Sequence, residues 1–304
     1  MKLQRRTFGG VQLCHGAAFP SKIFSKIKLA RPANFPLLAA MNITASITHQ
    51  GKFYQADLSH PLDISIPIAE GLNQVNCFYA PPVEFSPVVA GSFIGSTAQG
   101  GLVNFFNVKI NPHGNGTHTE CVGHIAKEKF TIRQCLTSFH FLAKLVSLYP
   151  TRLANGDRVF LREQFEEVLK PGEAEAFILR TLPNDEGKLH RNYSGSNPPY
   201  IDEAAAEYLA TCGVEHFLLD LPSVDREEDG GKLLAHRAFW QYFEGSEQPE
   251  RQASNPVRKN ATITELIFVS GFIKDGLYLL NLQTASFDLD VSPSKPVLFT
   301  FSEL

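Results

Sequence analysis

Alternation of apolar and polar residues predicts extended segments in the first half of the chain. Residues 42–54 alternate and carry Gly51 near a turn, which is typical of a strand or hairpin. Residues 104–111 also alternate and are rich in β-forming residues, so we expect a strand there. Residues 79–101 are rich in proline and glycine, which disfavours a helix, and we expect them to wrap a surface near the functional site. Residues 137–148 fit a helix or an extended segment equally well.

The second half combines one helical pattern with continuous apolar runs. Residues 200–212 place apolar side chains at helical spacing after Pro199 and end at Gly213, which predicts a helix with a glycine at its end. Uninterrupted apolar, β-branched runs are typical of buried parallel strands. Neither a repeat nor a linker interrupts the pattern, so we expect one strand-rich α/β domain with mixed sheets. Its strands are expected at residues 157–162, 177–180, 214–221 and 261–270.

Composition and charge narrow the class of protein. With 304 residues, 43% hydrophobic and 19% charged, the chain is typical of a globular protein with a substantial core. It contains no apolar run near the ~18 residues that span a bilayer, so we expect no membrane partner. Seven of its 28 basic residues lie in residues 1–40, which contain no acidic residue. Residues 41–304 therefore contain 21 basic and 31 acidic residues. This excess of acidic residues argues against a nucleic-acid partner, because binding phosphate requires a basic surface.

Residues 1–40 differ from the rest in composition, and the second of only two methionines, Met41, follows them directly. We interpret them as a basic leader, such as a transit peptide, or as translated sequence upstream of the true start. The folded domain is therefore expected to span residues 41–304. Five scattered cysteines form no CxxC pair, which fits reduced thiols in a cytoplasmic protein.

The candidate chemistry lies in the segment HGNGTHTECVGH, residues 113–124. Side chains repeat every two residues in an extended chain, so His118, Glu120 and His124 are expected on one face. Two imidazoles and a carboxylate make a mixed nitrogen and oxygen site suited to Zn²⁺ or Mn²⁺. His113 has the opposite parity and would face away, unless a β-bulge at Gly114–Gly116 shifts the register. The alternative is a histidine-bearing loop that binds no metal. It is the weaker interpretation, because three histidines and one acid lie within twelve residues.

These motifs resemble the cyclase family of metal-dependent hydrolases, which includes bacterial kynurenine formamidase and isatin hydrolase. The family's opening Asp-Leu-Ser-His-Pro is matched by residues 57–61, and the centre of its hallmark by Gly116-Thr117-His118 and His124. Residues 220–225 followed by Ala235-His236 resemble its second ligand segment, and Glu265 resembles its late bridging glutamate. The resemblance runs in order over residues 53–280.

The resemblance implies a compact domain of the swivelling β/β/α type, assembled as a homodimer or homotetramer. It implies that one or two divalent ions are held by His118, Glu120, His236 and Glu265, with His113 as a further candidate ligand. His124 corresponds to the family's proton-transferring histidine. A metal that activates water and polarises a carbonyl, next to a histidine that titrates near neutral pH, suits amide hydrolysis. We therefore expect a hydrolase of a small-molecule amide, of the arylformamidase type.

The chain departs from the family pattern near its first ligand. The family's first histidine falls on Gly114, its aspartate is replaced by Glu120, and its proline by Val122. The identity of the first ligand and the number of ions therefore stay open. An alternative function also stays open: a metal-binding protein of the same fold that has lost hydrolytic activity or serves as a ligand-binding module. Cys121 is expected to be a buried packing residue. Asp220 and Asp225 either orient a ligand histidine or cap a turn, and His60 lies near the site or has a structural role.

Overall fold

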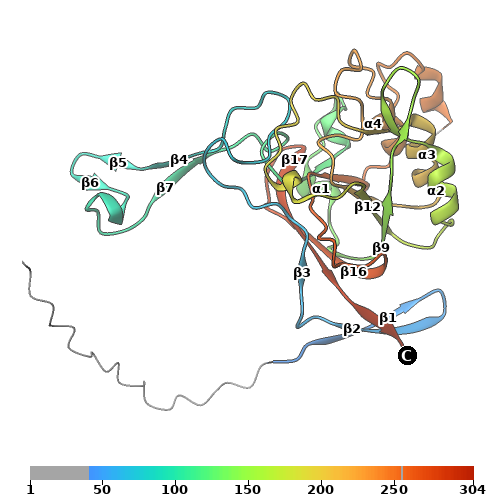
Figure 1. Cartoon of the computed structure of the whole chain (residues 1–304), viewed down its shortest axis with the longest axis horizontal. Coiled ribbons are helices and arrows are strands. Elements are labelled where there is room, and N and C mark those ends of the chain that lie inside the picture. The colour runs from blue at the N-terminus through green and yellow to red at the C-terminus, as the bar shows by residue number, and fades with distance from the viewer. Residues whose placement is uncertain (1–40, 255) are drawn as a thin grey trace, which may run out of the picture. The chain divides into compact units, whose positions relative to one another are not determined.

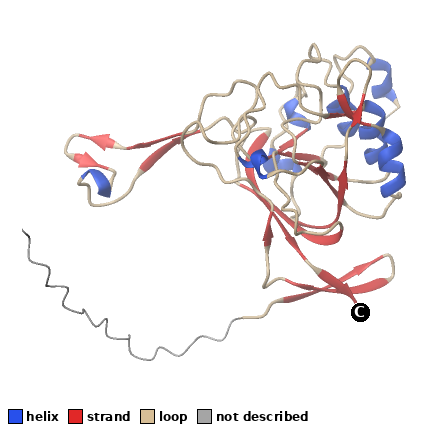
Figure 2. Ribbon diagram, viewed as in Figure 1, coloured by secondary structure: helices blue, strands red, loops and turns tan. Residues whose placement is uncertain are grey.

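Seven strands form a closed mixed sheet at the centre of the computed structural model, drawn as arrows in Figure 1 and in red in Figure 2. β9, β12, β14 and β15 are parallel neighbours, and β8, β17 and β16 complete the sheet with antiparallel pairings. Because β16 pairs with both β9 and β17, the last strand meets the first. The seven strands, in spatial order, are β16 (Gly276–Thr284), β9 (His140–Leu148), β12 (Ala176–Thr181), β14 (His216–Leu219), β15 (Thr262–Glu265), β8 (His118–Cys121) and β17 (Val291–Phe299).

Side chains alternate between two cores on the two faces of this sheet. Along β12, Ala176 and Ile178 belong to one core and Phe177 and Leu179 to the other. The first core fills the interior of the closed sheet, because it unites residues from strands on opposite sides, such as Ile178 of β12 and Leu298 of β17. The second core lies between the sheet and the helices, where Trp240 is fully buried. Burial on both faces explains the uninterrupted apolar runs of the parallel strands.

Four helices contribute to the described part of the chain. Three of them supply residues to the outer core: α2 (Arg162–Val168), α3 (Glu203–Thr211) and α4 (Leu234–Trp240). The short α1 (Ile132–Cys135) packs into the inner core through Ile132 and Cys135. The interior of the closed sheet is thus filled by side chains. A functional site therefore has to lie on the outer face of the sheet, near α4.

Smaller strands lie at the periphery. β1 (Thr44–His49), β2 (Lys52–Asp57) and β18 (Phe301–Glu303) form a three-stranded sheet, and β10 (Thr151–Arg152), β11 (Arg158–Phe160) and β13 (Tyr200–Ile201) form another. β3 (Leu62–Asp63) pairs with the outer part of β17. Single 3₁₀ turns cover Thr97–Gln99, Val122–His124, Glu186–Leu189 and Pro249–Ala253.

A two-stranded ribbon, residues 84–109, extends away from the closed sheet (Figure 1). Its strands are β4 (Glu84–Pro87) and β7 (Phe106–Lys109), and a short hairpin of β5 (Val89–Ala90) and β6 (Phe93–Ile94) follows β4. All four residues of β7 are exposed. The sequence led us to expect that residues 79–101 wrap a surface near the site, and the structure differs, because strand pairing carries most of this segment away from the body.

The strand-rich, mixed α/β class expected from the sequence is confirmed. The hairpin at residues 42–54 is present as β1 and β2, and residues 137–148 contain the strand β9. The predicted helix begins later than expected, because Asp202 caps α3 by accepting a hydrogen bond from the Ala204 N–H. Tyr200 and Ile201 pair with β11 instead.

The structure describes residues 41–254 and 256–304, so the expected leader, residues 1–40, lies outside it. Residues 41–304 group into one compact unit. Among the described helices, none has the length and apolar character needed to cross a bilayer.

Candidate metal centre

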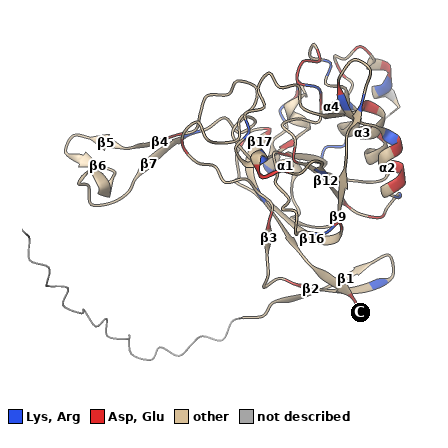
Figure 3. Cartoon of the chain, viewed as in Figure 1, with Lys and Arg blue, Asp and Glu red and all other residues tan. Residues whose placement is uncertain are grey.

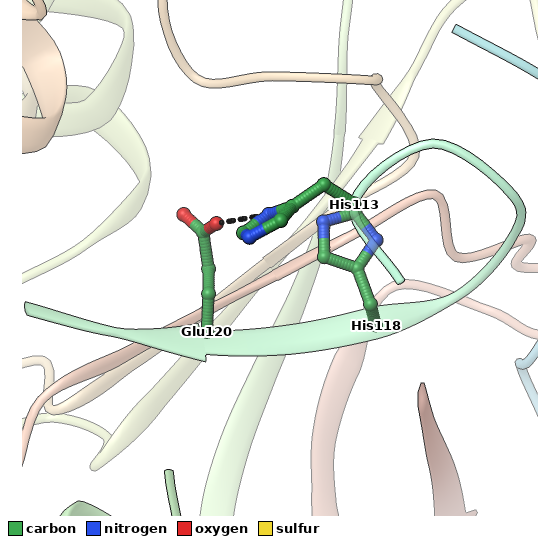
Figure 4. A group of neighbouring side chains, drawn as sticks. All are labelled: His113, His118 and Glu120. Carbon is green, nitrogen blue, oxygen red and sulfur yellow. Dashed lines mark ion pairs between the residues drawn. The ribbon is translucent and has the colours of Figure 1, made fainter. Parts of the chain in front are cut away.

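Strand register places His118, Glu120 and Glu265 on one buried face. β8 runs antiparallel to β15, with His118 opposite Glu265 and Glu120 opposite Ile263. Because side chains alternate, His118 and Glu120 share the outer face of the sheet, whereas Cys121 packs into the inner core. Figure 4 shows His118 and Glu120 rising from the same side of β8. His118 Nε2 lies 3.3 Å from Glu265 Oε2.

His113 reaches the same place from the turn that precedes β8. Its Nδ1 lies 3.1 Å from Glu120 Oε2, the ion pair drawn in Figure 4, and its Nε2 lies 3.0 Å from Asp290 Oδ2. Strand parity predicted that His113 faces away. Parity does not apply, because the strand begins only at His118 and a turn with Gly116 at φ 138° separates the two histidines.

His124 also arrives through a turn, and not through strand parity. β8 ends at Cys121, and the 3₁₀ turn Val122–His124 carries the imidazole back over the site. His124 Nδ1 lies 3.8 Å from Glu120 Oε2 and 3.5 Å from Asp290 Oδ2. Its side chain is 31% exposed, so His124 lies at the outer edge of the cluster.

His236 approaches from α4 and is oriented by Asp225. Asp225 Oδ2 lies 2.5 Å from His236 Nδ1, and Asp225 Oδ1 accepts a hydrogen bond from the Ala235 N–H at 2.7 Å. An imidazole that donates from Nδ1 presents the lone pair of Nε2. That nitrogen lies 3.0 Å from Glu120 Oε1 and 3.9 Å from Glu265 Oε1. Of the two open readings of Asp225, the structure supports the first, since Asp225 orients His236. Its other carboxylate oxygen accepts from the first turn of α4 and, within the described chain, does not cap the turn around Pro222.

The donor atoms of this cluster fit a divalent metal. His118 Nδ1 lies 2.9 Å from the Gly116 carbonyl oxygen, so a donated proton leaves its Nε2 facing the cluster. Among the described residues, buried His118 Nε2 and Glu120 Oε2 make no well-aligned hydrogen bond. Their nearest polar neighbours are other members of the cluster, Glu265 Oε2 at 3.3 Å and His113 Nδ1 at 3.1 Å. Buried polar atoms without a well-aligned partner are costly unless something binds them. Donor atoms lie within 4.8 Å of one another in three overlapping groups: His113–His118–Glu120, His113–His124–Asp290 and Glu120–His124–His236.

Charge in the cluster is strongly coupled. Burial by itself lowers the pKa of His113, but hydrogen bonds to Asp290 and Glu120 outweigh it and raise this pKa to about 10. For His236, too, burial is outweighed by Asp225 and Glu120, which hold its pKa well above the usual range. Burial raises the pKa of Glu120, but His124 and the hydrogen bonds from His113 and His236 lower it well below its usual range. Each of these shifts favours positive charge beside the carboxylates, which the imidazoles carry here.

The sequence reasoning missed Asp290. It directly precedes β17, and its carboxylate contacts both His113 and His124. Hydrogen bonds with His113 and His124 outweigh the effect of burial and hold the pKa of Asp290 below its usual range. No spacing signal points to Asp290, because 177 residues separate it from His113.

Two residues whose readings were open, Asp220 and His60, lie outside the cluster, as does the buried His216. Asp220 forms a buried ion pair with Lys188, at 2.7 Å, and so has a structural role. His60 is exposed and pairs with Asp57 at 2.7 Å, in the opening motif. Buried His216 hydrogen-bonds Thr262 Oγ1 at 2.8 Å through its Nδ1. These contacts satisfy the polar groups without a metal.

Comparison with solved structures shows the same fold in several proteins of low sequence identity. One is described as a predicted metal-dependent hydrolase from Bacillus stearothermophilus, with 14% identity over 79% of this chain and 98% of that chain, and a TM-score of 0.52. Isatin hydrolase A from Labrenzia aggregata has 10% identity over 79% of this chain and 93% of its own, with a TM-score of 0.54. A third structure, described as a novel cyclase, has 14% identity over 79% and 86% of the two chains, with a TM-score of 0.54.

Comparison by sequence gives two results. No curated protein matches the chain. The family model described as putative cyclase matches residues 56–226, which is more than half of the chain and includes His113, His118, Glu120 and His124. The resemblance noted from the motifs is thereby confirmed, and the chain belongs to the cyclase family.

Proposed function

We propose that this protein is a metal-dependent hydrolase that cleaves the C–N bond of a small-molecule amide, in the manner of an arylformamidase. The products would be a carboxylate and an amine, formed with consumption of one water molecule. Solved structures of the same fold carry the descriptions metal-dependent hydrolase and isatin hydrolase, which supports this class of reaction.

The observation that carries the proposal is the convergence of nitrogen and oxygen donors on two buried atoms at the centre of the cluster. His118 Nε2 and Glu120 Oε2 are buried and make no well-aligned hydrogen bond among the described residues, and further imidazole and carboxylate donors surround them. We assign the ligand role to His118, Glu120, His236, Glu265 and His113, as the resemblance implies, and add Asp290 on geometry. Nitrogen and oxygen donors of this kind suit Zn²⁺ or Mn²⁺, as one ion or two.

Within this proposal, a bound divalent ion supplies Lewis acidity and lowers the pKa of water toward neutrality. The chain's own residues do the rest. Asp225 holds His236 in one orientation, and the Val224 N–H donates to Glu265 Oε1 at 2.9 Å, which fixes that carboxylate. His124, at the exposed edge, transfers a proton to the departing nitrogen. A positioned acid or base of this kind contributes roughly 10²–10⁴-fold to the rate.

A cavity of about 420 Å³ adjoins the cluster and includes His113 and Asp290 in its wall. Its size is typical of sites for small organic molecules. The remaining wall is mostly apolar, which favours a substrate with an aromatic or cyclic body. Its apolar residues are Pro81, Pro82, Ile110, Pro112, Leu289 and Val291.

Elemental analysis of the purified protein, followed by turnover assays with N-formylkynurenine, isatin and simple amides, tests the proposal. We expect a near-stoichiometric divalent metal and hydrolysis of at least one of these amides. Glu120→Gln should lose both, because it removes the central buried carboxylate. Glu166→Gln is the matched control, since Glu166 lies on α2, its side chain is 42% exposed, and among the described residues its carboxylate pairs with Arg162.

Two outcomes contradict the proposal in different ways. If the purified protein contains no metal and Glu120→Gln changes neither its metal content nor its turnover, the metal centre is refuted. A protein that binds metal at this site but hydrolyses no amide would instead favour the second function class, a metal-binding or ligand-binding protein of the same fold.

A further inference from the structure

A second cavity, of about 120 Å³, is lined by Glu203 at the start of α3, by α4, and by the loops on either side of α4 within residues 230–251. It shares no lining residue with the metal centre or with the 420 Å³ cavity. The connection to the metal centre is the helix α4, since Arg237, in the wall of this cavity, directly follows His236.

Arg237 is a buried cation without a carboxylate partner. It is 9% exposed, yet among residues 41–254 and 256–304 no acidic side chain pairs with it. Its Nε donates to the Lys232 carbonyl at 3.0 Å, and its Nη1 donates to the carbonyls of Tyr242 and Glu244 at 3.3 and 3.1 Å. Within the described chain, Nη2 makes no hydrogen bond. A buried charge that is not paired destabilises a fold unless a counter-ion binds it.

The other charged groups of the cavity compensate one another. Lys232 Nζ lies 3.6 Å from Glu247. Arg251 pairs with Glu203 and Glu207 and stacks over the ring of Phe243, 4.1 Å from its centroid. The three acids, Glu203, Glu207 and Glu247, are all engaged by Arg251 and Lys232, so Arg237 is the cation of the lining without a carboxylate.

We propose that this cavity binds a small oxyanion, held by Arg237 Nη2 with Lys232 at its rim. The cavity, about 120 Å³, is well below the ~300 Å³ of typical sites for whole nucleotides and drug-sized ligands, which favours a ligand of the size of phosphate or a short carboxylate. A guanidinium donates well-directed hydrogen bonds to such oxygens.

The experiment is calorimetric titration of the full-length protein with inorganic phosphate, at constant ionic strength maintained with chloride. We expect saturable binding of one phosphate per chain. Arg237→Gln should weaken it roughly ten- to hundredfold, the usual worth of hydrogen bonds to a charged group. Lys232→Met, at an exposed side chain, should weaken it less and keep the protein folded. Arg152→Gln is the matched control, because Arg152 is exposed and lies on β10, outside the cavity.

Phosphate binding to the metal centre is distinguished by His118→Ala, which should leave binding at Arg237 unchanged. Absence of saturable binding by the unaltered protein overturns the inference. So does binding that survives both Arg237→Gln and Lys232→Met, or binding that His118→Ala abolishes. Circular dichroism of every variant verifies that a loss of binding is not a loss of fold.

Discussion

At the scale of single residues, the site divides between buried groups and an exposed edge. His118 and Glu120 are fully buried, whereas the side chains of His113, His124 and Asp290 are about 30% exposed. A ligand needs to be desolvated and fixed, while a group that exchanges protons with substrate and solvent needs access. Exposure therefore distinguishes His124 from the buried ligands His118 and Glu120, while the ligand role of the equally exposed His113 and Asp290 rests on their contacts within the cluster.

The contrast between His124→Ala and His118→Ala tests this division. We expect His124→Ala to keep most of its metal and lose roughly 10²–10⁴-fold in turnover. His118→Ala should lose or weaken metal binding itself, because it removes a buried nitrogen donor. Metal content and rate are measured on both. Equal loss of metal from the two variants would make His124 a ligand.

His216 gives the protein a pH-dependent stability that is separate from the site. Burial, assisted by the nearby Arg258 charge, lowers the pKa of His216 to about 3, whereas an unfolded histidine has a pKa of ~6.5. As pH falls below ~6.5, the unfolded chain binds a proton that the folded chain excludes. The free energy of unfolding should therefore fall by up to about 1.4 kcal/mol per pH unit from this group.

Chemical denaturation of His216→Gln between pH 4.5 and 7 measures this contribution. The variant should show a shallower loss of stability with acid, whereas exposed His140→Gln should follow the unaltered protein. Identical slopes for His216→Gln and the unaltered protein would refute the assignment.

The sequence predicted the candidate ligands that lie in local motifs. It did not predict the contacts that depend on the geometry of turns. The pattern around His118 and Glu120 is readable because both residues lie on one strand. The positions of His113 and His124 follow from turns on either side of that strand, which parity does not describe. Asp290 joins them only through the pairing of β17 with β8, and no local pattern encodes that pairing.

At the scale of elements, the ribbon of residues 84–109 is unusual. Residues 85–108 contain no charged side chain, and Figure 3 draws the ribbon tan beyond its base. Its rings Phe93, Phe105 and Phe106 are 40–58% exposed, and four aliphatic residues add to this surface: Val89, Leu102, Val103 and Val108. Together they expose an apolar area on the order of 600 Å², as large as the largest patches on typical monomers.

We expect two ribbons to pack in a homodimer, in line with the dimer or tetramer that the family resemblance implies. An isolated two-stranded ribbon is barely stable in water, and two such surfaces would bury about 1,200 Å², near the lower limit of a standard interface. The double variant Phe106→Ser, Val108→Ser should shift sedimentation equilibrium toward monomer. Phe272→Ser is the control, since Phe272 is 87% exposed and lies outside the ribbon. A protein that is monomeric at every concentration would contradict the expectation.

Elements were predictable where one short segment carries its own pattern. The apolar runs of β14 and β15 and the spacing of α3 are of this kind. Closure of the sheet was not predictable, since it depends on β16 pairing with β17 and β9 at once. The ribbon was missed because its proline and glycine content masked the strand pairing of Glu84–Pro87 with Phe106–Lys109.

At the scale of the whole molecule, every residue assigned to the metal centre, and every strand of the closed sheet, lies within residues 41–304. We therefore expect a variant that begins at Met41 to fold and to bind metal like the full chain. Metal content and melting temperature, compared between the two, check this expectation. Loss of soluble expression, or a large fall in melting temperature, would show that residues 1–40 are needed.

The closed sheet has a consequence for the time course of folding. His113 meets Asp290 across 177 residues, and Glu120 meets His236 across 116. Contacts between such distant segments form slowly, because the entropy of closing a long loop is lost before the contact stabilises the chain. We expect refolding from denaturant to be slow, with metal uptake in the same kinetic phase as the final burial of Trp240. Because His236, Glu265 and Asp290 are synthesised late, we expect the complete metal site to form only after a ribosome has made nearly the whole chain.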